Sequence, residues 1–308
     1  MPRYLGVDGG GTKTAFVLVD GRGEVLATAT GPSCYYFTAG IDLVERVLRD
    51  GVRQLLDTAG LTTADVDRAF FALPAYGEAS ADVPELDAAP GRVLGHGRYS
   101  CGNDMIAGWA GSLAGRDGVN VVAGTGSIAY GEWRGRGQRA GGWGEVFGDE
   151  GSGYWTAIRG LNAYSRMVDG RLPQGPLLAA MREAVGVRSD LDAIGVVIDD
   201  WAGKRDRVAA LSRVVTAAAA DGDGAAQAIV EDAGRELAAL AESVRAAIGA
   251  EGERVPLSWS GGMFEDAGVR AAFAAALGEG WDLREPVHGP GVGAALYAMK
   301  QAGAPLPG

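Results

Sequence analysis

The first part of the chain alternates apolar and polar segments in a pattern typical of a β-hairpin. Residues 5–20 read as an apolar strand, a turn of three glycines closed by polar residues, and a second apolar strand. A further glycine turn follows at residues 21–23. The pattern therefore predicts two antiparallel strands whose connecting tip is rich in glycine.

The rest of the chain mixes short apolar runs with hydrophobic residues at three- and four-residue spacing, which indicate strands and amphipathic helices. The long alanine-rich segment after residue 177 is predicted to be a helical scaffold without chemistry of its own. We expect strands at 24–29, 68–73, 91–95, 119–123 and 254–259, and helices at 41–60, 105–114, 177–250, 263–277 and 292–300.

The tip of the first hairpin carries groups suited to a phosphate and a metal ion. Gly10 and Gly11 let backbone N–H groups converge on an anion. Thr12 adds a hydroxyl donor, Lys13 a positive charge, and Asp8 a carboxylate suited to Mg²⁺. An ordinary tight hairpin is the alternative, but a simple turn has no use for this set of polar residues. The motif is not a Walker A loop, because a strand and not a helix follows it.

A similar arrangement occurs a second time. Gly124, Thr125, Gly126 and Ser127 lie between one apolar strand and another, and the second strand ends at a Gly-Arg-Gly turn. The likeness to the dinucleotide-binding fingerprint is set aside because that fingerprint must open a helix. The recurrence predicts two similar domains, each with a phosphate-binding hairpin. Two such tips would grip the two ends of a polyphosphate.

A carboxylate also stands where a strand is predicted to meet a helix. Asn103 and Asp104 precede the helix-forming run 105–114. Such a carboxylate is kept ionised by the helix macrodipole, which suits a functional group, but capping the helix is its most frequent role. Both interpretations of Asp104 stay open on this pattern alone.

Two glycine-rich segments in the second half are further candidates. Residues 141–155 interleave Trp143 and other aromatic residues with Asp149, as a sugar or metal site would, although a surface Ω-type loop is the alternative. Gly261 and Gly262 lie between a predicted strand and a predicted helix, where a flat ring or a ribose could lie against the backbone.

Composition excludes several classes of partner. The net charge of −11 argues against nucleic acid, which selects for basic surfaces. No apolar run approaches the ~20 residues of a membrane span, and the first residues lack a signal-peptide pattern, so we expect a cytoplasmic protein that does not associate with membranes. Cys34 and Cys101 form no CxxC motif and indicate neither a disulfide framework nor a zinc site.

Taken together, these motifs resemble those of the actin-like ATPase superfamily. More narrowly, the series is similar to the BadF/BadG/BcrA/BcrD ATPase family, which contains N-acetylglucosamine kinase. The resemblance runs in order over residues 5–300 and rests on the combination of motifs. The motifs are Asp8 to Lys13, Gly124 to Ser127, Gly142 to Gly144 with Gly148 to Ser152, and Ser260 to Gly262.

The resemblance implies an α/β fold of two ribonuclease-H-like domains with a cleft between them. We expect residues 1–106 to form the first domain and residues 107–308 the second, with the last helix at about 292–300 able to pack back on the first. The implied activity is an ATP-dependent sugar kinase that uses ATP and Mg²⁺, accepts an amino sugar or related hexose, and forms a homodimer.

The resemblance also implies roles for individual residues. Asp104 would be the catalytic base and Asp8 would act with the metal. The two glycine-rich tips would be the phosphate loops, and the Gly261–Gly262 pair would lie at the adenosine. The implied nucleotide-binding residues are Gly10, Gly11, Thr12, Lys13, Gly124, Thr125, Gly126, Ser127, Gly261 and Gly262, and the implied sugar-binding residues are Tyr76, Glu78, Asn103, Asp104, Gly126, Trp143 and Asp149.

Departures from the family pattern bear on the sugar. Where N-acetylglucosamine kinases carry a Ser-x-Asn loop, this chain has residues 33–36, an aromatic segment, and Ile128 replaces an Asn after the second tip. Residues 74–78 replace a loop of small residues. The sequence thus leaves open whether an N-acetyl group is required, with glucosamine or another hexose as alternatives.

Two other functions stay open at this stage. One is an ATPase that activates a dehydratase or reductase through an iron–sulfur cluster shared by two subunits, for which two cysteines per chain could supply four ligands. The other is a non-catalytic sugar sensor, which the intact set of Asp8, Lys13 and Asp104 disfavours.

Overall fold

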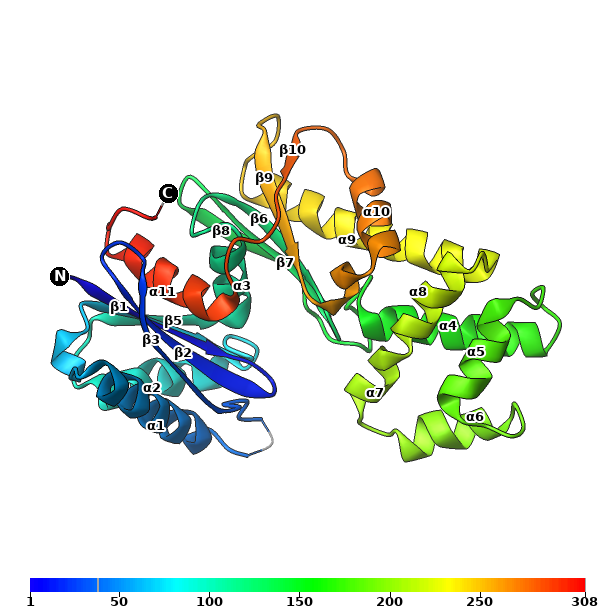
Figure 1. Cartoon of the computed structure of the whole chain (residues 1–308), viewed down its shortest axis with the longest axis horizontal. Helices are drawn as coiled ribbons and strands as arrows, with labels where there is room; N and C mark the ends of the chain where they lie inside the picture. The colour runs from blue at the N-terminus through cyan, green and yellow to red at the C-terminus, as the bar shows by residue number, and fades with distance from the viewer. Residues whose placement is uncertain (38, 308) are drawn as a thin grey trace. The chain divides into compact units, whose positions relative to one another are not determined.

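The computed structural model describes residues 1–37 and 39–307, and it separates into two compact units. Unit one comprises Met1–Asn120 and Arg284–Gly308, and unit two comprises Val121–Leu283. Figure 1 shows one mixed sheet flanked by helices in each unit. The predicted α/β class with two ribonuclease-H-like units is confirmed by this architecture.

The sheet of unit one has the strand order β3-β2-β1-β4-β5. The predicted hairpin is present, because β1 and β2 pair antiparallel with Gly9 opposite Thr14. Strand β3 extends this meander, whereas β4 and β5 run parallel to β1. The bounds are β1 Arg3–Gly9, β2 Lys13–Asp20, β3 Val25–Pro32, β4 Arg68–Leu73 and β5 Tyr99–Asn103.

Alternating side chains of these strands fill two cores, one on each face of the sheet, as the period of two in a strand requires. Leu5 and Val7 of β1 pack with helices α1 (Asp42–Ala59) and α2 (Val83–Leu94) on one face. Tyr4 of β1 joins the opposite core, which contains residues of α3 (Asp104–Ser112) and α11 (Pro290–Gln301). Strands β1, β2 and β4 therefore bury residues on both sides, which explains their nearly continuous apolar sequences.

The segment 91–95, predicted as a strand, is instead the end of helix α2, so that prediction is wrong. Leu86, Ala89 and Leu94 recur at helical spacing and are buried in the core of unit one. Pro84 stands in the first turn, where its missing N–H is not needed. The strand itself follows as β5, four residues after Gly95.

The expected domain boundary at residues 106/107 differs from the compact units. It falls inside helix α3, and unit one continues to Asn120. Helix α11 belongs to unit one, where it packs against α3 and β1. Helix α3 lies wholly in unit one, and the change of unit occurs inside β6 (Gly118–Ala123).

Unit two repeats the topology of unit one. Its sheet has the order β10-β9-β6-β7-β8, which matches the first sheet strand for strand when read from the other end. Strands β7 and β8 pair antiparallel, and β9 and β10 pair parallel. The predicted duplication is thus present in the structure. The remaining bounds are β7 Ser127–Trp133, β8 Arg136–Gly141, β9 Val255–Ser260 and β10 Trp281–Leu283.

The segment from residue 177 to 250 is helical, as predicted, and with α4 it builds a second core in unit two. Many of its apolar residues pack on one another and on α4, while helix α9 also packs against β7 and β8 of the sheet. The helices are α4 Gly153–Val168, α5 Pro176–Val185, α6 Asp192–Ile194, a π-helical turn Gly195–Asp200, α7 Arg205–Ala210, α8 Ser212–Ala220 and α9 Gly224–Ala247, followed after β9 by a 3₁₀ turn Gly262–Glu265 and α10 Ala267–Ala276.

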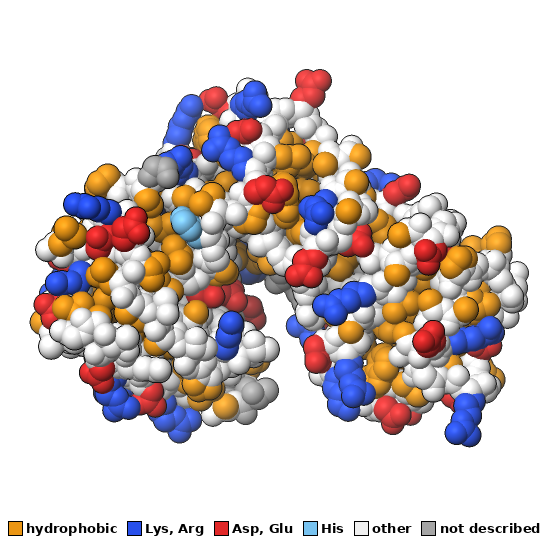
Figure 2. Space-filling model, viewed as in Figure 1, with side chains coloured by type: hydrophobic (Ala, Val, Ile, Leu, Met, Phe, Trp, Pro, Cys, Tyr) orange, Lys and Arg blue, Asp and Glu red, His pale blue; other side chains and the backbone are white. Residues whose placement is uncertain are grey.

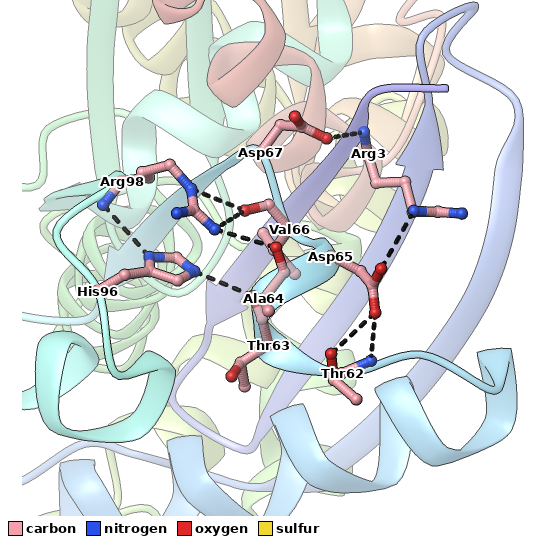
Figure 3. Close-up of polar contacts among 9 residues, drawn as sticks. All are labelled: Arg3, Thr62, Thr63, Ala64, Asp65, Val66, Asp67, His96 and Arg98. Carbon is pink, nitrogen blue, oxygen red and sulfur yellow. Dashed lines mark hydrogen bonds and ion pairs between the residues drawn. The ribbon is translucent and has the colours of Figure 1, made fainter.

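A polar network fastens the amino ends of β1, β4 and β5 (Figure 3). Asp67 accepts a hydrogen bond of 2.8 Å from the backbone N–H of Arg3. The Arg98 guanidinium donates to the carbonyls of Val66 and Ala64 at 3.0 and 3.1 Å. The network satisfies backbone carbonyls that the strands leave unpaired. The network does not include the carboxyl ends of the parallel strands, which is where α/β folds bind ligands.

Basic and acidic side chains are interspersed on the face that Figure 2 shows. The described residues visible on that face form no broad basic area, in keeping with the net charge of −11. Within the described part of the chain, no helix has the length and apolar character needed to cross a membrane.

Close packing of β1 against helix α11 yields a test of the fold. A methyl group on Gly6 would lie 2.1 Å from the backbone nitrogen of Ala295. We therefore expect Gly6→Ala to destabilise unit one by about 1–3 kcal/mol and to lower its thermal midpoint by several degrees. The control is Gly97→Ala, where the added methyl meets nothing within 4 Å. Equal midpoints for the two variants would contradict this packing.

Candidate active site

The glycine tip of unit one is open to solvent. Gly11, Thr12 and Lys13 are exposed. The turn is closed by a hydrogen bond of 2.9 Å from the N–H of Gly10 to the carbonyl of Lys13. Ser33 donates its hydroxyl to the carbonyl of Gly10 at 2.8 Å and so fixes the tip to β3. The tip thus presents backbone amides, a hydroxyl and an ammonium group to the surroundings.

The base of the same hairpin is tightly packed. A methyl group on Gly9 would lie 2.6 Å from the sulfur of Cys34 and 2.7 Å from Pro74, so only glycine fits there. Cys34 is buried, and this burial raises the pKa of its thiol to about 11. Tyr36 is also buried, whereas Phe37 is exposed. The aromatic segment 34–37 therefore serves partly as core beside the first tip.

Two carboxylates stand at the carboxyl ends of the parallel strands. Asp8 lies near the end of β1, and Asp104 follows β5 directly as the first residue of α3. Strand β4 lies between β1 and β5, which separates the two backbone positions by about 10 Å. The topology thus brings together two acidic residues that are 96 positions apart (104 − 8).

Burial raises the pKa values of both carboxyl groups. Burial, and after it the charge of Asp8, raises the pKa of Asp104 to about 7. Burial also raises the pKa of Asp8 to about 6, an effect that nearby Lys13 partly offsets. A carboxylate with a pKa close to neutral pH is well matched to accept a proton in a reaction.

The helix cap of α3 is Asn103 and not Asp104. The side chain of Asn103 accepts the N–H of Met105 at 3.2 Å, and its amide donates to the carbonyl of Tyr76 at 3.3 Å. The interpretation of Asp104 as a simple cap is therefore wrong. Asn103 is buried and occupied in this way, which fixes the backbone from which Asp104 projects.

The loop after β4 contributes two predicted sugar-binding residues to this area. The hydroxyl of Tyr76 donates to Asp87 of α2 at 2.8 Å, so its polar end is already bonded. Glu78 is close enough to Asp104 for its negative charge to raise the pKa of Asp104. Of the two, Glu78 is the one whose charge acts on the carboxylate pair.

The second glycine tip, in unit two, is hydrogen-bonded to the start of helix α4 and to the segment that precedes it. The carbonyl of Gly124 accepts the N–H of Gly153 at 2.7 Å. The hydroxyl of Ser127 donates to the carbonyl of Glu150 at 2.6 Å. Gly126 must be glycine, because a methyl group there would lie 2.7 Å from a carboxylate oxygen of Asp149. The loop 148–153 therefore determines the shape of this tip.

Asp149 and Trp143, both predicted to bind the sugar, occupy contrasting environments. Asp149 is 4% exposed and has a positive φ of 55°. One carboxylate oxygen faces the N–H of Ser127 at 3.4 Å, and the other accepts from Arg205 at 2.8 Å. Trp143 is 61% exposed, with the guanidinium of Arg139 5.4 Å from its ring centre. The indole ring is thus available to a ligand.

A cavity of about 530 Å³ in unit two adjoins the second tip. Gly124 and Thr125 form one wall and Gly262 another, so three of the predicted nucleotide-binding residues border one space. Gly261 has a φ of 98°, and a methyl group there would lie 2.4 Å from the carbonyl oxygen of Ala123. This close approach explains the glycine at position 261, whereas a methyl group on Gly262 would meet nothing within 4 Å.

The cavity also has walls that the sequence did not indicate. Helices α7 and α8 border it, although the segment containing them was predicted to carry no chemistry. Small and polar side chains of an alanine-rich helix give no distinctive pattern, which is why the prediction missed them. The residues concerned are Asp206, Ala209, Ala210, Ser212, Arg213 and Thr216.

Two duplicated sheets, each carrying a glycine-rich hairpin tip, are the architecture of actin-like ATPases. The chain belongs to the BadF/BadG/BcrA/BcrD ATPase family, whose sequence profile matches residues 5–298.

Characterised relatives are sugar kinases by name. The chain is 29% identical to an N-acetyl-D-glucosamine kinase of Dictyostelium discoideum, over 96% of this chain and 97% of that protein. It is 30% identical to an N-acetylmuramic acid/N-acetylglucosamine kinase of Clostridium acetobutylicum, over 86% of this chain and 87% of that protein. A solved structure from Chromobacterium violaceum, provisionally named an N-acetylglucosamine kinase, aligns with a TM-score of 0.73 at 26% identity, over 97% and 99% of the two chains.

The raised pKa values predict that unit one is less stable at higher pH. Between the usual carboxyl pKa near 3.8 and about 7, the folded state holds a proton at Asp104 that the unfolded state has lost. Stability should therefore fall as pH rises through this window. We expect Asp104→Asn, which removes the ionisable group, to raise the thermal midpoint at pH 8 relative to the wild type, and to do so less at pH 5.

The measurement is thermal unfolding in the presence of EDTA at both pH values. Asp57→Asn, at an exposed position of α1, is the control and should show no such pH-dependent difference. A gain for Asp104→Asn that is the same at both pH values would contradict the raised pKa.

Proposed function

We propose that this protein is a kinase that transfers the γ-phosphoryl group of ATP to a hydroxyl of an amino sugar, with N-acetylglucosamine or glucosamine as the expected substrate. The observation that carries the proposal is the carboxylate of Asp104, which is largely buried and is relieved of helix capping by Asn103. The two named relatives, which act on N-acetylglucosamine and N-acetylmuramic acid, support the class of substrate.

In this proposal Asp104 is the general base. Its raised pKa suits it to take the proton of the attacking hydroxyl as the new bond to phosphorus forms. The transition state of phosphoryl transfer is loose and places negative charge on the phosphoryl oxygens. The amide of Gly11, the Thr12 hydroxyl and the Lys13 ammonium would stabilise that charge, whereas the N–H of Gly10 closes the hairpin.

The donor set around Asp8 fits Mg²⁺. Among the described residues, no three acidic, histidine or cysteine side chains gather into a metal-binding group. Mg²⁺ bound with a nucleotide commonly needs only one or two protein carboxylates, because phosphates and water supply the other ligands. Asp8 would hold the ion directly or through water. When bound, the ion would neutralise charge on the phosphates.

Unit two would contribute residues that bind the nucleotide and residues that bind the sugar. The cavity beside Gly262 would receive the adenosine, with the phosphates at the second tip, Gly124 to Ser127. The exposed ring of Trp143 would stack on the apolar face of the sugar. Asp149 would accept a sugar hydroxyl with the carboxylate lone pairs that Ser127 and Arg205 leave open.

The remaining candidate side chains of unit one fall into two groups, those that hold Asp104 in place and one that would act through its charge. Asn103 and the hydroxyl of Tyr76 are bonded within unit one, so we assign them to holding Asp104 and its loop in place. Glu78 would contribute charge near the sugar. The proposal also includes a homodimer, as the family resemblance implies, and a cytoplasmic location, as the composition and first residues led us to expect.

The surroundings of the cysteines disfavour the iron–sulfur alternative. Cluster ligands are thiolates in reach of the iron. Cys34 is packed against the base of the first hairpin. The thiol of Cys101 points to the carbonyl of Leu86 at 3.6 Å, and burial raises its pKa strongly. Cys34 is a buried residue of the core and Cys101 packs against it, and the raised pKa of each thiol favours the protonated form.

The test is ADP release with ATP and Mg²⁺ against glucosamine, N-acetylglucosamine, N-acetylmuramate, glucose and mannose, with a control lacking sugar. We expect stimulation by at least one amino sugar. Asp104→Asn should lower kcat by at least about 10²-fold, the usual contribution of a general base, with little change in nucleotide affinity.

Asp57→Asn serves as the control and should retain normal turnover. ATP hydrolysis that no sugar stimulates would refute the kinase assignment, and near-normal turnover by Asp104→Asn would remove Asp104 as the base.

A further inference from the structure

One arginine of helix α7 bridges two carboxylates of the same loop. The Nε atom of Arg205 lies 3.0 Å from Oε2 of Glu145, and its Nη2 atom lies 2.8 Å from Oδ2 of Asp149. The two acids are four residues apart in the glycine-rich loop that follows β8. Without a cation between them, their charges would repel and favour an opened loop.

The bridge lies partly out of solvent. The side chain of Asp149 is 6% exposed, whereas those of Glu145 and Arg205 are 28% and 43% exposed. Exposed ion pairs contribute little, but removing one partner of a buried pair leaves an uncompensated charge. The contact with Asp149 should therefore matter more than the contact with Glu145.

The rest of this loop has few anchors of its own. Val146 and Phe147, between the two acids, are 86% and 75% exposed and so add little packing. On its other side, the Asp149 carboxylate faces the N–H of Ser127 in the second glycine tip. Asp149 is thus held between the tip and helix α7, and Arg205 supplies the α7 half of that grip.

Helix α7 touches the nucleotide cavity as well. Asp206, the residue after Arg205, borders the cavity together with Ala209 and Ala210 of the same helix. One short helix therefore contacts both the loop predicted to bind the sugar and the space predicted to bind the adenosine.

We propose that Arg205 is a positioning residue that holds Asp149 and the loop 143–149 in the geometry that receives the sugar. The inference rests on the proposed function, in which Asp149 and Trp143 contact the sugar. Arg205 itself touches neither the reacting atoms nor the nucleotide in this assignment. Its loss should weaken use of the sugar while leaving use of ATP nearly intact.

The test compares Arg205→Met, Arg205→Lys and Arg207→Met in the full-length protein. Arg207 is an exposed residue of the same helix that lies outside the cavity lining, and it serves as the matched control. The first readout is hydrogen–deuterium exchange of peptides covering residues 142–151. The second is KM for the sugar and KM for ATP, measured separately along with kcat.

For Arg205→Met we expect faster exchange in residues 142–151 and a rise of about tenfold or more in KM for the sugar, as for the loss of one partner of a buried charge pair. KM for ATP should change less than about twofold. Arg205→Lys, which keeps the charge but not the two-pronged geometry, should restore part of the loss. Arg207→Met should match the wild type.

The two readouts separate the possible failures. Unchanged exchange in Arg205→Met would overturn the positioning role whatever the activity. Faster exchange with an unchanged KM for the sugar would overturn the link between this loop and the sugar. Equal rises in both KM values, with faster exchange throughout unit two, would show that Arg205 merely supports the fold. If the wild type phosphorylates no sugar, the proposed function fails, and the exchange data alone decide whether Arg205 fixes the loop.

Discussion

The candidate site of unit one depends on one constraint, the burial of two like-charged carboxylates at one end of a parallel sheet. Burial raises the pKa of both Asp8 and Asp104 toward neutrality, and the charge of Asp8 raises the pKa of Asp104 further. Such an arrangement persists only where the surrounding structure imposes it. Here the sheet is clamped by α11 on one face, and a polar network closes the opposite ends of its strands. Stability is thus concentrated away from the carboxylate pair.

The duplicated topology uses the same hairpin in two ways. In unit one the tip is exposed and carries its own charge at Lys13. In unit two the tip has no cation within it, and the loop 148–153 holds it from behind through Gly124 and Ser127. Contacts from other parts of unit two therefore shape the second tip. Arg205 of α7 takes part in them through Asp149. A duplicated strand order can carry different local chemistry because loops vary independently of the sheet.

The sequence predicted the elements that depend on local pattern. The first hairpin, the duplication and the helical character of residues 177–250 follow from apolar spacing and glycine turns. Residues 91–95 were mistaken for a strand because their few apolar residues fit either period once the helix start at Val83 is overlooked. The boundary at 106/107 falls inside α3, whereas unit one continues to Asn120 and also includes α11, the last helix, whose return to the first domain the sequence analysis allowed.

Within the candidate site, residue types suggested candidate chemistry, and the structure shows which elements position those residues. Asp104 and the glycine tips were identified from the sequence, but neighbouring Asn103 proved to be the helix cap. That distinction depends on which of two adjacent side chains turns back toward the helix, and both residue types are good caps. Arg205 and the cavity-lining residues of α7 came to light only in three dimensions, because a charged residue in a polar helix has no distinguishing sequence pattern.

The role of Asp104 as the general base is tested most directly by the pH dependence of kcat/KM for sugar phosphorylation, measured at saturating Mg²⁺. The base must be ionised to accept a proton, and the pKa of Asp104 is raised to about 7. We therefore expect kcat/KM to fall as the pH is lowered below that value. The slow turnover left in Asp104→Asn should lack this acid limb. A flat profile for the wild-type protein down to about pH 5, where an ordinary carboxyl group would still be largely ionised, would contradict the account.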